Sequence, residues 1–265
     1  MASLQRAVEL MSSDETTSEG ARVLPNPRRG IVLRHVSFGY DPGRRVLRGL
    51  DLEIPAGGIL CIVGPSGAGK TTLLSLLLRL YDPDEGSIEI DGIDLKAFHP
   101  RSVRERIALV PQDPVLLDGS LMQNIALSRP GSSRAELMEA ARLAQVEDFA
   151  HSLPAGYDTQ IVEGGARLSA GQRWRVALAR ALMRRAPVLL LDDPSAGIDL
   201  EEEPRLLAAI RGLPGARTVV MVTRAVTLAP QADRTVGLRE GRIEVSAPLA
   251  SPNLGAGTAA PSQEL

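Results

Sequence analysis

Cysteine, aromatic residues and long hydrophobic runs are all scarce in this chain of 265 residues. The single cysteine, Cys61, excludes an internal disulfide and is compatible with a reducing compartment. No apolar run approaches the ~18–20 residues that a membrane-spanning helix needs, and residues 1–20 are polar and acidic, without the apolar centre of a secretory signal. Aromatic residues make up 3% of the chain and the net charge is −2. The core must therefore be aliphatic, and no general attraction to nucleic acid is expected.

A glycine-rich stretch at 64–72 lies between an apolar segment with the pattern of a buried strand, 59–63, and one with the pattern of a buried helix, 73–78. It fits the phosphate-binding pattern G-x-x-x-x-G-K-[ST] in the strand–loop–helix context that the pattern requires. Glycines let backbone N–H groups wrap around phosphate oxygens, and the helix N-terminus adds partial positive charge. We expect Lys70 to reach the β- and γ-phosphates and the Thr71 hydroxyl to hold Mg²⁺. The expected nucleotide-binding residues of this stretch are Gly64, Pro65, Ser66, Gly67, Ala68, Gly69, Lys70, Thr71 and Thr72.

The apolar segment at 188–192 ends in Asp192 and has the pattern of a strand in the middle of a parallel sheet. A second such strand is expected at 218–222. A phosphate-binding loop together with an apolar strand that ends in Asp is the minimum set of a P-loop NTPase, in which Asp192 orders Mg²⁺. An ordinary strand-to-loop exit is the alternative for Asp192. The absence of a G-x-G-x-x-G pattern excludes a dinucleotide-binding oxidoreductase.

The rest of the chain divides into regions by its local patterns. We predict an N-terminal helix and linker over 1–29, a nucleotide-binding domain over 30–246, and a disordered tail over 247–265. A glycine-rich break at Glu163-Gly164-Gly165 interrupts a helical pattern that extends from about 121 to 183. The further strands that we expect are 31–33, 36–40, 46–54 and 107–111, with a short strand and turn over 87–92 and a closing hairpin over 233–245.

A series of short segments resembles, in the expected order, the motifs of ATP-binding-cassette (ABC) ATPases. The segment Leu168-Ser169-Ala170-Gly171-Gln172 resembles the LSGGQ signature and is the most specific of them. Tyr40 matches the A-loop aromatic residue, Gln112 the Q-loop, 159–165 the X-loop typical of exporters, and 196–199 the D-loop. The resemblance covers residues 31–246 and is to the nucleotide-binding domain of an exporter. It implies an α/β fold: a P-loop NTPase with a RecA-like parallel core sheet, a small antiparallel β subdomain and an inserted α-helical signature subdomain at about 117–183.

The resemblance also implies ligands and partners. The family binds ATP and Mg²⁺ between two domains in a head-to-tail dimer, so Ser169, Gly171 and Gln172 are expected to bind the γ-phosphate held by a partner domain. Tyr40 is expected to stack on adenine, a place in the core being the alternative. Gln112 is expected to contact Mg²⁺ and the reacting groups, an ordinary loop position being the alternative. The implied partners are an ABC membrane domain and a second nucleotide-binding domain, at the cytoplasmic face of the cell membrane, with no nucleic acid.

Two departures from the family pattern fall on catalytic groups. Asp193 stands where fully active members carry Glu, so the expected general base is one methylene shorter. Arg224 stands where they carry His; it retains a cation for phosphate but cannot act as a neutral hydrogen-bond relay. The histidines of the chain, His35, His99 and His151, cannot be realigned to that position. Smaller departures are Ala170 in the signature, Gly197 and Ile198 in the D-loop, and Trp174, which we place either at an interface or over its own helix.

These departures weaken the site built on the chain's own P-loop and leave the signature nearly whole. We expect one half of a heterodimeric exporter, which binds Mg-ATP and hydrolyses it weakly with Asp193, Arg224 and Gln112 as catalytic groups; a homodimer would hold two weakened sites. The alternative is a soluble ABC-type regulatory module without transport. A nucleic-acid-associated ABC ATPase needs a coiled coil or a basic groove, and the sequence has neither. Residues 4–10 are similar to the segment after the last membrane helix of exporters, which predicts either a fragment or a chain that has lost its membrane half.

Overall fold

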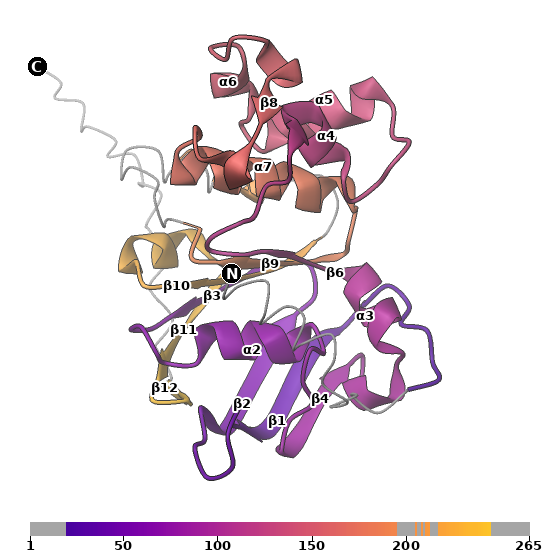
Figure 1. Ribbon diagram of the computed structural model, residues 1–265. Coiled ribbons are helices and arrows are strands. Elements are labelled where there is room, and N and C mark those ends of the chain that lie inside the picture. Colours follow the sequence, from indigo (N-terminus) through magenta and orange to yellow (C-terminus); the bar gives the residue numbers. More distant parts are fainter. Residues whose placement is uncertain (1–19, 195–204, 206–207, 209, 213–216, 245–265) are drawn as a thin grey trace, which may run out of the picture.

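The computed structural model describes residues 20–194, 205, 208, 210–212 and 217–244, and Figure 1 shows a helical subdomain standing above two sheets. The helix expected at the N-terminus, the D-loop residues 196–199 and the tail at 247–265 lie outside the described residues. Among the described helices, none combines the length and the apolar character needed to cross a membrane.

The larger sheet has six strands in the order β12-β11-β3-β10-β9-β6. Neighbouring strands from β11 to β6 are parallel, and β12 closes the edge as the antiparallel arm of a hairpin with β11. This is the parallel core sheet that the sequence predicts, so the predicted fold class is confirmed. Its strands are β3 (Ile59–Val63), β6 (Ile107–Val110), β9 (Val188–Asp192), β10 (Thr218–Thr223), β11 (Arg234–Arg239) and β12 (Arg242–Glu244), with the 3₁₀ segment η4 (Val226–Gln231) between β10 and β11.

Both faces of the parallel sheet are covered, which explains why its central strands read as unbroken apolar runs. In β9, Leu189 and Leu191 face the core of the helical subdomain, whereas Val188 and Leu190 face a second core shared with the smaller sheet. The helix α2 (Lys70–Leu77) packs in that second core, and Figure 1 shows it between the two sheets. The loop before α2 is therefore fixed between a buried strand and a buried helix.

The smaller sheet is antiparallel, with the strand order β2-β1-β4-β5. The sequence predicts separate strands at 31–33 and 36–40, but the structure has one strand, β1 (Gly30–Phe38). A bulge at His35, where φ is 50°, shifts the register and lets both segments pair with β2. Tyr40 lies beyond the end of the strand. The other strands are β2 (Leu47–Pro55), β4 (Glu85–Ile90) and β5 (Ile93–Asp94).

The helical subdomain is built around α7 (Ala170–Met183), which packs against α4 and α5. Trp174 is fully buried in this core, so it lies at neither of the places that the sequence suggests for it. The helical pattern predicted over 121–183 is also interrupted by a short strand, β8, which pairs with β7. The elements around α7 are β7 (Gly119–Ser120), α4 (Leu121–Ala126), α5 (Arg134–Leu143), α6 (Glu147–Ala150), η2 (Gly156–Asp158), β8 (Gln160–Ile161) and η3 (Glu163–Gly165).

Residues 20–29, which the sequence assigns to a linker, belong to the folded domain. Arg22 N donates to Ala97 O (3.1 Å), and His99 N donates to Arg22 O (2.7 Å). Leu24 is buried, and its N–H donates to Ser102 Oγ (3.1 Å). The segment therefore lies along η1 (Leu95–Ala97) and α3 (Pro100–Arg106), because side-chain and backbone partners are available on both.

The end of this segment is fixed by the Asp91 carboxylate, which accepts hydrogen bonds from the N–H groups of Arg28, Arg29 and Gly30. Burial alone raises the pKa of Asp91, but these N–H donors outweigh it, and the net pKa lies below the ordinary value. The folded-state pKa is thus lower than the unfolded one. The carboxylate stabilises the fold above the unfolded pKa, and this contribution is lost as the pH falls through the folded pKa.

Replacing Asp91 by asparagine is expected to lower the free energy of unfolding by about 1–2 kcal/mol at neutral pH, because charge-assisted hydrogen bonds are lost. Asparagine suits this position, where φ is 53°. Urea unfolding of both proteins at several pH values measures the difference, which should shrink as the pH falls below about 4. A difference that does not depend on pH would show that the charge is not its source.

Candidate functional site

The glycine-rich loop joins β3 to α2 and passes very close to its neighbours. A Cβ at Gly64 would lie 2.2 Å from Leu238 O, and Gly69, the N-cap residue just before α2, has φ 104°. The Lys70 ammonium folds back over the loop and donates to Gly64 O (2.7 Å) and Pro65 O (2.8 Å). Only glycine fits the two tight positions, and the loop presents a lysine charge and a helix N-terminus at the same place.

Thr71 and Asp192 meet at the carboxyl edge of the parallel sheet although they lie 121 residues apart. Thr71 Oγ1 donates to Asp192 Oδ2 at 3.0 Å. Burial raises the pKa of Asp192; the Thr71 hydrogen bond and the Lys70 charge oppose this shift, and the Asp193 charge adds to it. The hydroxyl and the carboxylate are hard oxygen ligands of the kind that Mg²⁺ prefers.

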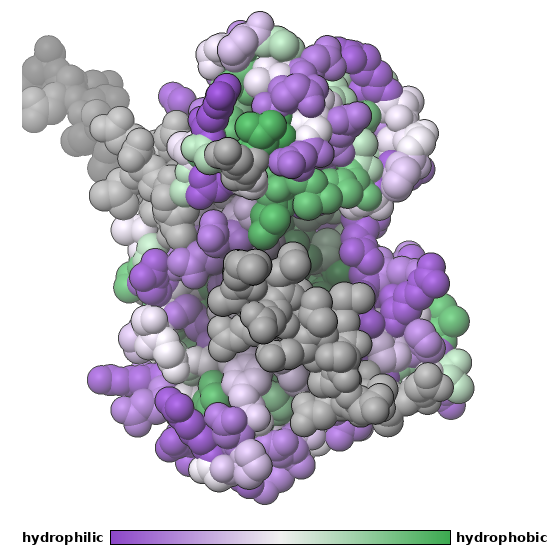
Figure 2. Space-filling view, in the orientation of Figure 1, coloured by the Kyte–Doolittle hydropathy of each residue, from purple (hydrophilic) through white to green (hydrophobic). Residues whose placement is uncertain are grey.

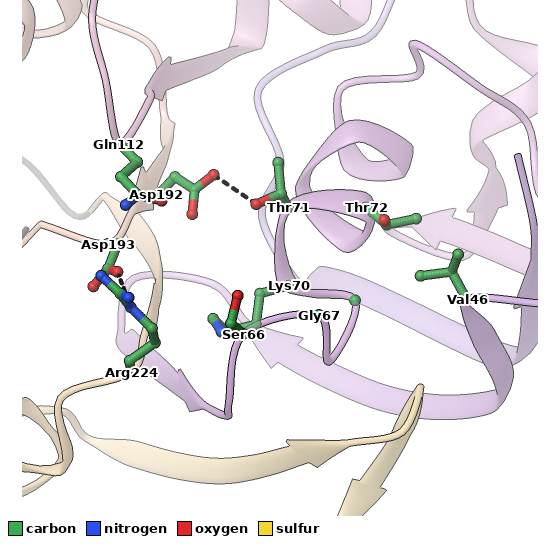
Figure 3. A pocket seen from close by; sticks show the side chains of 11 residues that line it. Val46, Ser66, Gly67, Lys70, Thr71, Thr72, Gln112, Asp192, Asp193 and Arg224 are labelled. Atoms are coloured by element: carbon green, nitrogen blue, oxygen red, sulfur yellow. Dashed lines mark hydrogen bonds and ion pairs between the residues drawn. The ribbon is translucent and has the colours of Figure 1, made fainter.

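Asp193 follows β9 directly, with φ 44°, and its N–H donates to Val222 O (2.8 Å) on β10. This backbone turns the carboxylate toward the end of β10. Thr223 Oγ1 donates to Asp193 Oδ1 (3.1 Å), and Arg224 Nε donates to Asp193 Oδ2 (2.8 Å). The Asp193 side chain is 5% exposed and that of Arg224 55%. Each oxygen of the expected general base therefore has a hydrogen-bond donor, and Figure 3 shows the one from Arg224.

The loop, the two aspartates and Arg224 line one pocket, which Figure 3 shows opening between them. The pKa of Lys70 lies below its ordinary value. Burial lowers it most, the charges of Asp193 and Asp192 oppose this shift, and the charge of Arg224 adds to it. Gln112 lines the pocket at the end of β6, opposite the loop. The expected residues in the pocket lining are Ser66, Gly67, Gly69, Lys70, Thr71, Thr72, Gln112, Asp192, Asp193 and Arg224. Gly64, Pro65 and Ala68 belong to the same loop without lining the pocket.

Tyr40 lies beside the loop, and its hydroxyl donates to Thr72 Oγ1 at 3.3 Å. Its ring makes edge contacts with Phe38 and Tyr81, with centroids 5.1 and 5.3 Å away. The side chain is 51% exposed, so it is not the core aromatic of the alternative interpretation. An open ring face next to the phosphate loop is suited to stack on a base.

The signature residues lie away from this pocket, at the start of α7. Ser169 Oγ accepts from Gln172 N (3.1 Å), and Gln172 Oε1 accepts from Ser169 N (3.0 Å), which is a reciprocal capping box. Ser169 is exposed, whereas Gly171 is buried. Within the described part of the chain, the lining of the P-loop pocket includes no signature residue. The exposed helix N-terminus is available to an anion from outside the chain.

Sequence reasoning missed two groups that position the site. Thr223 holds the Asp193 carboxylate, and the only signal was a hydroxyl residue at the end of a parallel strand. Arg180 on α7 donates to Val115 O (3.0 Å) and to Asn124 O (3.0 Å), which ties the signature helix to the segment after Gln112. Burial lowers the pKa of Arg180. Its place in an ordinary helical pattern gave no sign of this role.

The residues present fit a magnesium–nucleoside triphosphate. The glycine cradle, Lys70 and the helix N-terminus suit phosphate oxygens, and Thr71 with Asp192 supplies ligands of the type that Mg²⁺ takes. In the part of the chain that the structure describes, no cluster of three or more metal-ligating side chains occurs. A cation here therefore needs phosphate oxygens and water to complete its shell, as Mg²⁺ commonly does.

Comparisons with known proteins agree with this geometry. A family model described as ABC transporter matches residues 47–196. The chain is 41% identical over 216 residues to the ATM1-type heavy metal exporter of Novosphingobium aromaticivorans, covering 82% of this chain and 36% of that protein. It is 41% identical over 246 residues to the ATP-dependent lipid A-core flippase of Salmonella paratyphi A, and the match covers 92% of this chain and 42% of that protein. A solved bacterial Atm1-family ABC exporter with ATP bound superposes with a TM-score of 0.82 at 38% identity, covering 92% of this chain and 43% of that one. The chain thus spans about two fifths of the length of the proteins that it matches.

Proposed function

The chain belongs to the ABC transporter family, and from this premise we propose that it is the ATP-binding part of an exporter with a weak site of its own. It binds Mg-ATP at its P-loop, with Lys70 on the phosphates and Thr71 and Asp192 on the metal. It hydrolyses ATP slowly and completes the stronger site of a different partner chain. The bound nucleotide supplies the phosphates and Mg²⁺ the charge neutralisation.

The Asp193–Arg224 ion pair is the observation that carries this proposal. A general base must reach the attacking water within hydrogen-bond distance. Aspartate is one methylene shorter than the usual glutamate, and here both of its oxygens already accept hydrogen bonds, from Thr223 and Arg224. A carboxylate that is both shorter and already hydrogen-bonded by Thr223 and Arg224 is a poor base, because misplacement of about 1 Å from the attacking water can cost on the order of 10²-fold in rate.

The signature supports the other half of the proposal. Ser169 begins a well-capped helix, and its hydroxyl oxygen accepts from Gln172 N, so the hydroxyl proton remains available to a phosphate oxygen. This arrangement supports phosphate recognition by the signature on a face that we propose serves a partner, whereas the catalytic residues of the chain's own site differ from the family pattern. Two identical copies would combine two weakened sites, so the proposal favours a heterodimer.

We further propose that the membrane domain of the exporter docks on the helical subdomain. Figure 2 shows hydrophobic side chains gathered on this part of the molecule. Val115, Leu117 and Val162 are exposed there, and a groove lined by Ile161 and Leu168 adjoins Val162. The longer relatives are exporters, so a membrane domain is the occupant that this apolar surface suits. The chain would then lie at the cytoplasmic face of the cell membrane.

Replacing Ser169 by aspartate tests whether the signature serves a partner. Aspartate is as good an N-cap as serine, so α7 should be retained, but its charge repels a phosphate. We expect the variant to bind Mg-ATP at its own P-loop as the unmodified chain does. The turnover of the assembly copurified from detergent-solubilised membranes should fall at least about 10-fold, since a phosphate donor is lost.

Ser133 provides a matched control, because it begins α5 with the same capping box. Ser133→Asp should leave turnover unchanged. If Ser169→Asp has no more effect than Ser133→Asp, the signature does not contribute to a partner's site. If the chain copurifies without any membrane protein, the regulatory-module alternative replaces the exporter proposal.

A further inference from the structure

Three of the chain's few aromatic side chains meet in one cluster beside the P-loop. Phe38, Tyr40 and Tyr81 lie with ring centroids 5.1, 5.3 and 5.4 Å apart in the three pairs. The whole chain has only three phenylalanines, three tyrosines and one tryptophan, so a large share of its aromatic rings is gathered here. The planes of Phe38 and Tyr81 stand at 84° and 86° to that of Tyr40, which is a favourable geometry for aromatic pairs.

The aromatic cluster lies on the side of the pocket away from the catalytic groups. Tyr40 donates a hydrogen bond to Thr72 Oγ1 (3.3 Å), and Thr72 and Val46 both line the pocket. Figure 3 shows Thr72 and Val46 on one side of the P-loop and Asp193 with Arg224 on the other. A nucleotide whose phosphates occupy the loop would therefore extend its base toward Tyr40.

The place of Tyr81 is set by the turn that ends α2. The backbone reverses at Arg79, where φ is 52°, and Leu80 N donates to Ser75 O (3.0 Å), as in a Schellman motif. The side chain of Arg79 is fully buried, and its Nε donates to Asp82 Oδ1 (3.1 Å). Tyr81 thus lies in the sequence between the two members of a buried ion pair, and the turn that carries its ring is fixed on both sides.

The segment after this turn also holds the backbone that carries Tyr40. Gly39 N donates to Asp84 Oδ2 (3.0 Å), and Asp84 N donates to Ser37 O (3.0 Å). Residues 79–85 therefore contact the Tyr40 ring through Tyr81 and hold the residue directly before it through Asp84. Because Tyr40 is 51% exposed, these contacts and the Thr72 hydrogen bond are important for the orientation of its ring.

We propose that Tyr81 and Asp84 are positioning residues for the base of the bound nucleotide, because they hold Tyr40 with one ring face open for stacking. The inference rests on the proposed function, since it concerns the same Mg-ATP site, and it adds two residues outside the pocket lining. Stacking requires the two ring planes to lie face to face, so a ring that can tilt loses part of the contact. A ring that is oriented before the nucleotide arrives also avoids the cost of being ordered on binding.

Inorganic tripolyphosphate separates this role from a merely structural one, because it carries three linked phosphates without a base. The test is calorimetric titration of the full chain with a non-hydrolysable Mg-ATP analogue and, in parallel, with Mg-tripolyphosphate. Tyr81→Leu is expected to weaken the analogue about 3–10-fold and to leave tripolyphosphate affinity within about twofold, since only part of a base-stacking contact is lost. Tyr81→Phe keeps the ring and should restore the ratio of the two affinities.

Asp84→Ala is an independent variant at an exposed position, and it preserves the test if Tyr81→Leu does not fold. It removes the acceptor of Gly39 N and should show the same selective loss of analogue affinity. Asp51→Ala is the matched control, because the exposed Asp51 carboxylate accepts a hydrogen bond from His35 N (2.8 Å) within the same sheet. This control should leave both affinities unchanged.

A double-mutant cycle with Tyr40→Ala shows whether Tyr81 acts through Tyr40. Once the Tyr40 ring is removed, Tyr81→Leu should cause no further loss of analogue affinity. The inference is overturned by additive losses in the cycle, by equal loss of analogue and tripolyphosphate, or by unchanged analogue affinity in both Tyr81→Leu and Asp84→Ala. Each of these results leaves ATP binding by the unmodified chain intact. If the unmodified chain binds neither ligand, the proposed function fails as well, so the two failures are distinguishable.

Discussion

Replacing Lys70 by alanine is expected to lower the affinity for Mg-ATP by about 10²-fold or more. Lys70 lies at the first turn of α2 and is 9% exposed, with its ammonium over the loop at 2.7 Å from Gly64 O and 2.8 Å from Pro65 O. A phosphate in the cradle would take over those contacts. Each charge-assisted hydrogen bond contributes about 1.5–3 kcal/mol, which is roughly 10–150-fold in affinity, and Lys70 is expected to contact two phosphates.

The composition of the chain offers a sharp control, because its only lysines are Lys70 and Lys96. Lys96 lies on η1, away from the pocket lining, with its ammonium near Pro83 O (3.4 Å). Lys96→Ala should leave ATP affinity within twofold. Acetylation followed by mass spectrometry should show Mg-ATP protecting Lys70 and not Lys96. Unchanged affinity in Lys70→Ala, or equal protection of both lysines, would contradict a phosphate site at this loop.

The parallel sheet and the P-loop could be predicted because their signals are local. The runs that became β3, β9 and β10 are apolar throughout, since both faces of these strands are buried. The bulge at His35 could not be read in this way, because the break in alternation there looks like the end of one strand and the start of another. The linker prediction failed at residues 20–29 because their hydrogen-bond partners, Asp91 and Ser102, come from distant segments.

The same distinction holds within the candidate site. Residue type and spacing identified Asp193 and Arg224 as departures from the family pattern, but not that they bind each other. That pairing depends on the left-handed backbone at Asp193 and on Thr223, which together aim the carboxylate at the end of β10. The burial of Trp174 could have been predicted, because Trp174, Ala177, Leu178, Ala181 and Leu182 follow helical spacing and form one apolar face, which is buried in the structure.

The double variant Asp193→Glu/Arg224→His is expected to raise ATP turnover of the purified chain by about 10²-fold, toward the order of 1–10 s⁻¹ of a working enzyme. Glutamate restores the reach of the base, and removing Arg224 frees the carboxylate oxygen that it holds at 2.8 Å. Neither single change is expected to restore turnover. Asp193→Glu leaves the Arg224 guanidinium to bind the new carboxylate, and Arg224→His leaves an aspartate that is one methylene too short. The gain should therefore exceed the product of the single gains, as is expected for residues in direct contact.

Glutamate tolerates the φ of 44° at position 193 less well than aspartate, so a small loss of stability is expected and should be checked by thermal unfolding. The matched control is Glu89→Asp/Arg34→His, which alters an exposed ion pair on the antiparallel sheet and should not change turnover. If the unmodified chain already turns over ATP at 1–10 s⁻¹, Asp193 serves as the base despite its ion pair, and the asymmetric exporter loses its main support. If the double variant binds Mg-ATP but stays inactive, the weakness of the site does not lie in this pair, because both groups that distinguish it from an active site have then been restored.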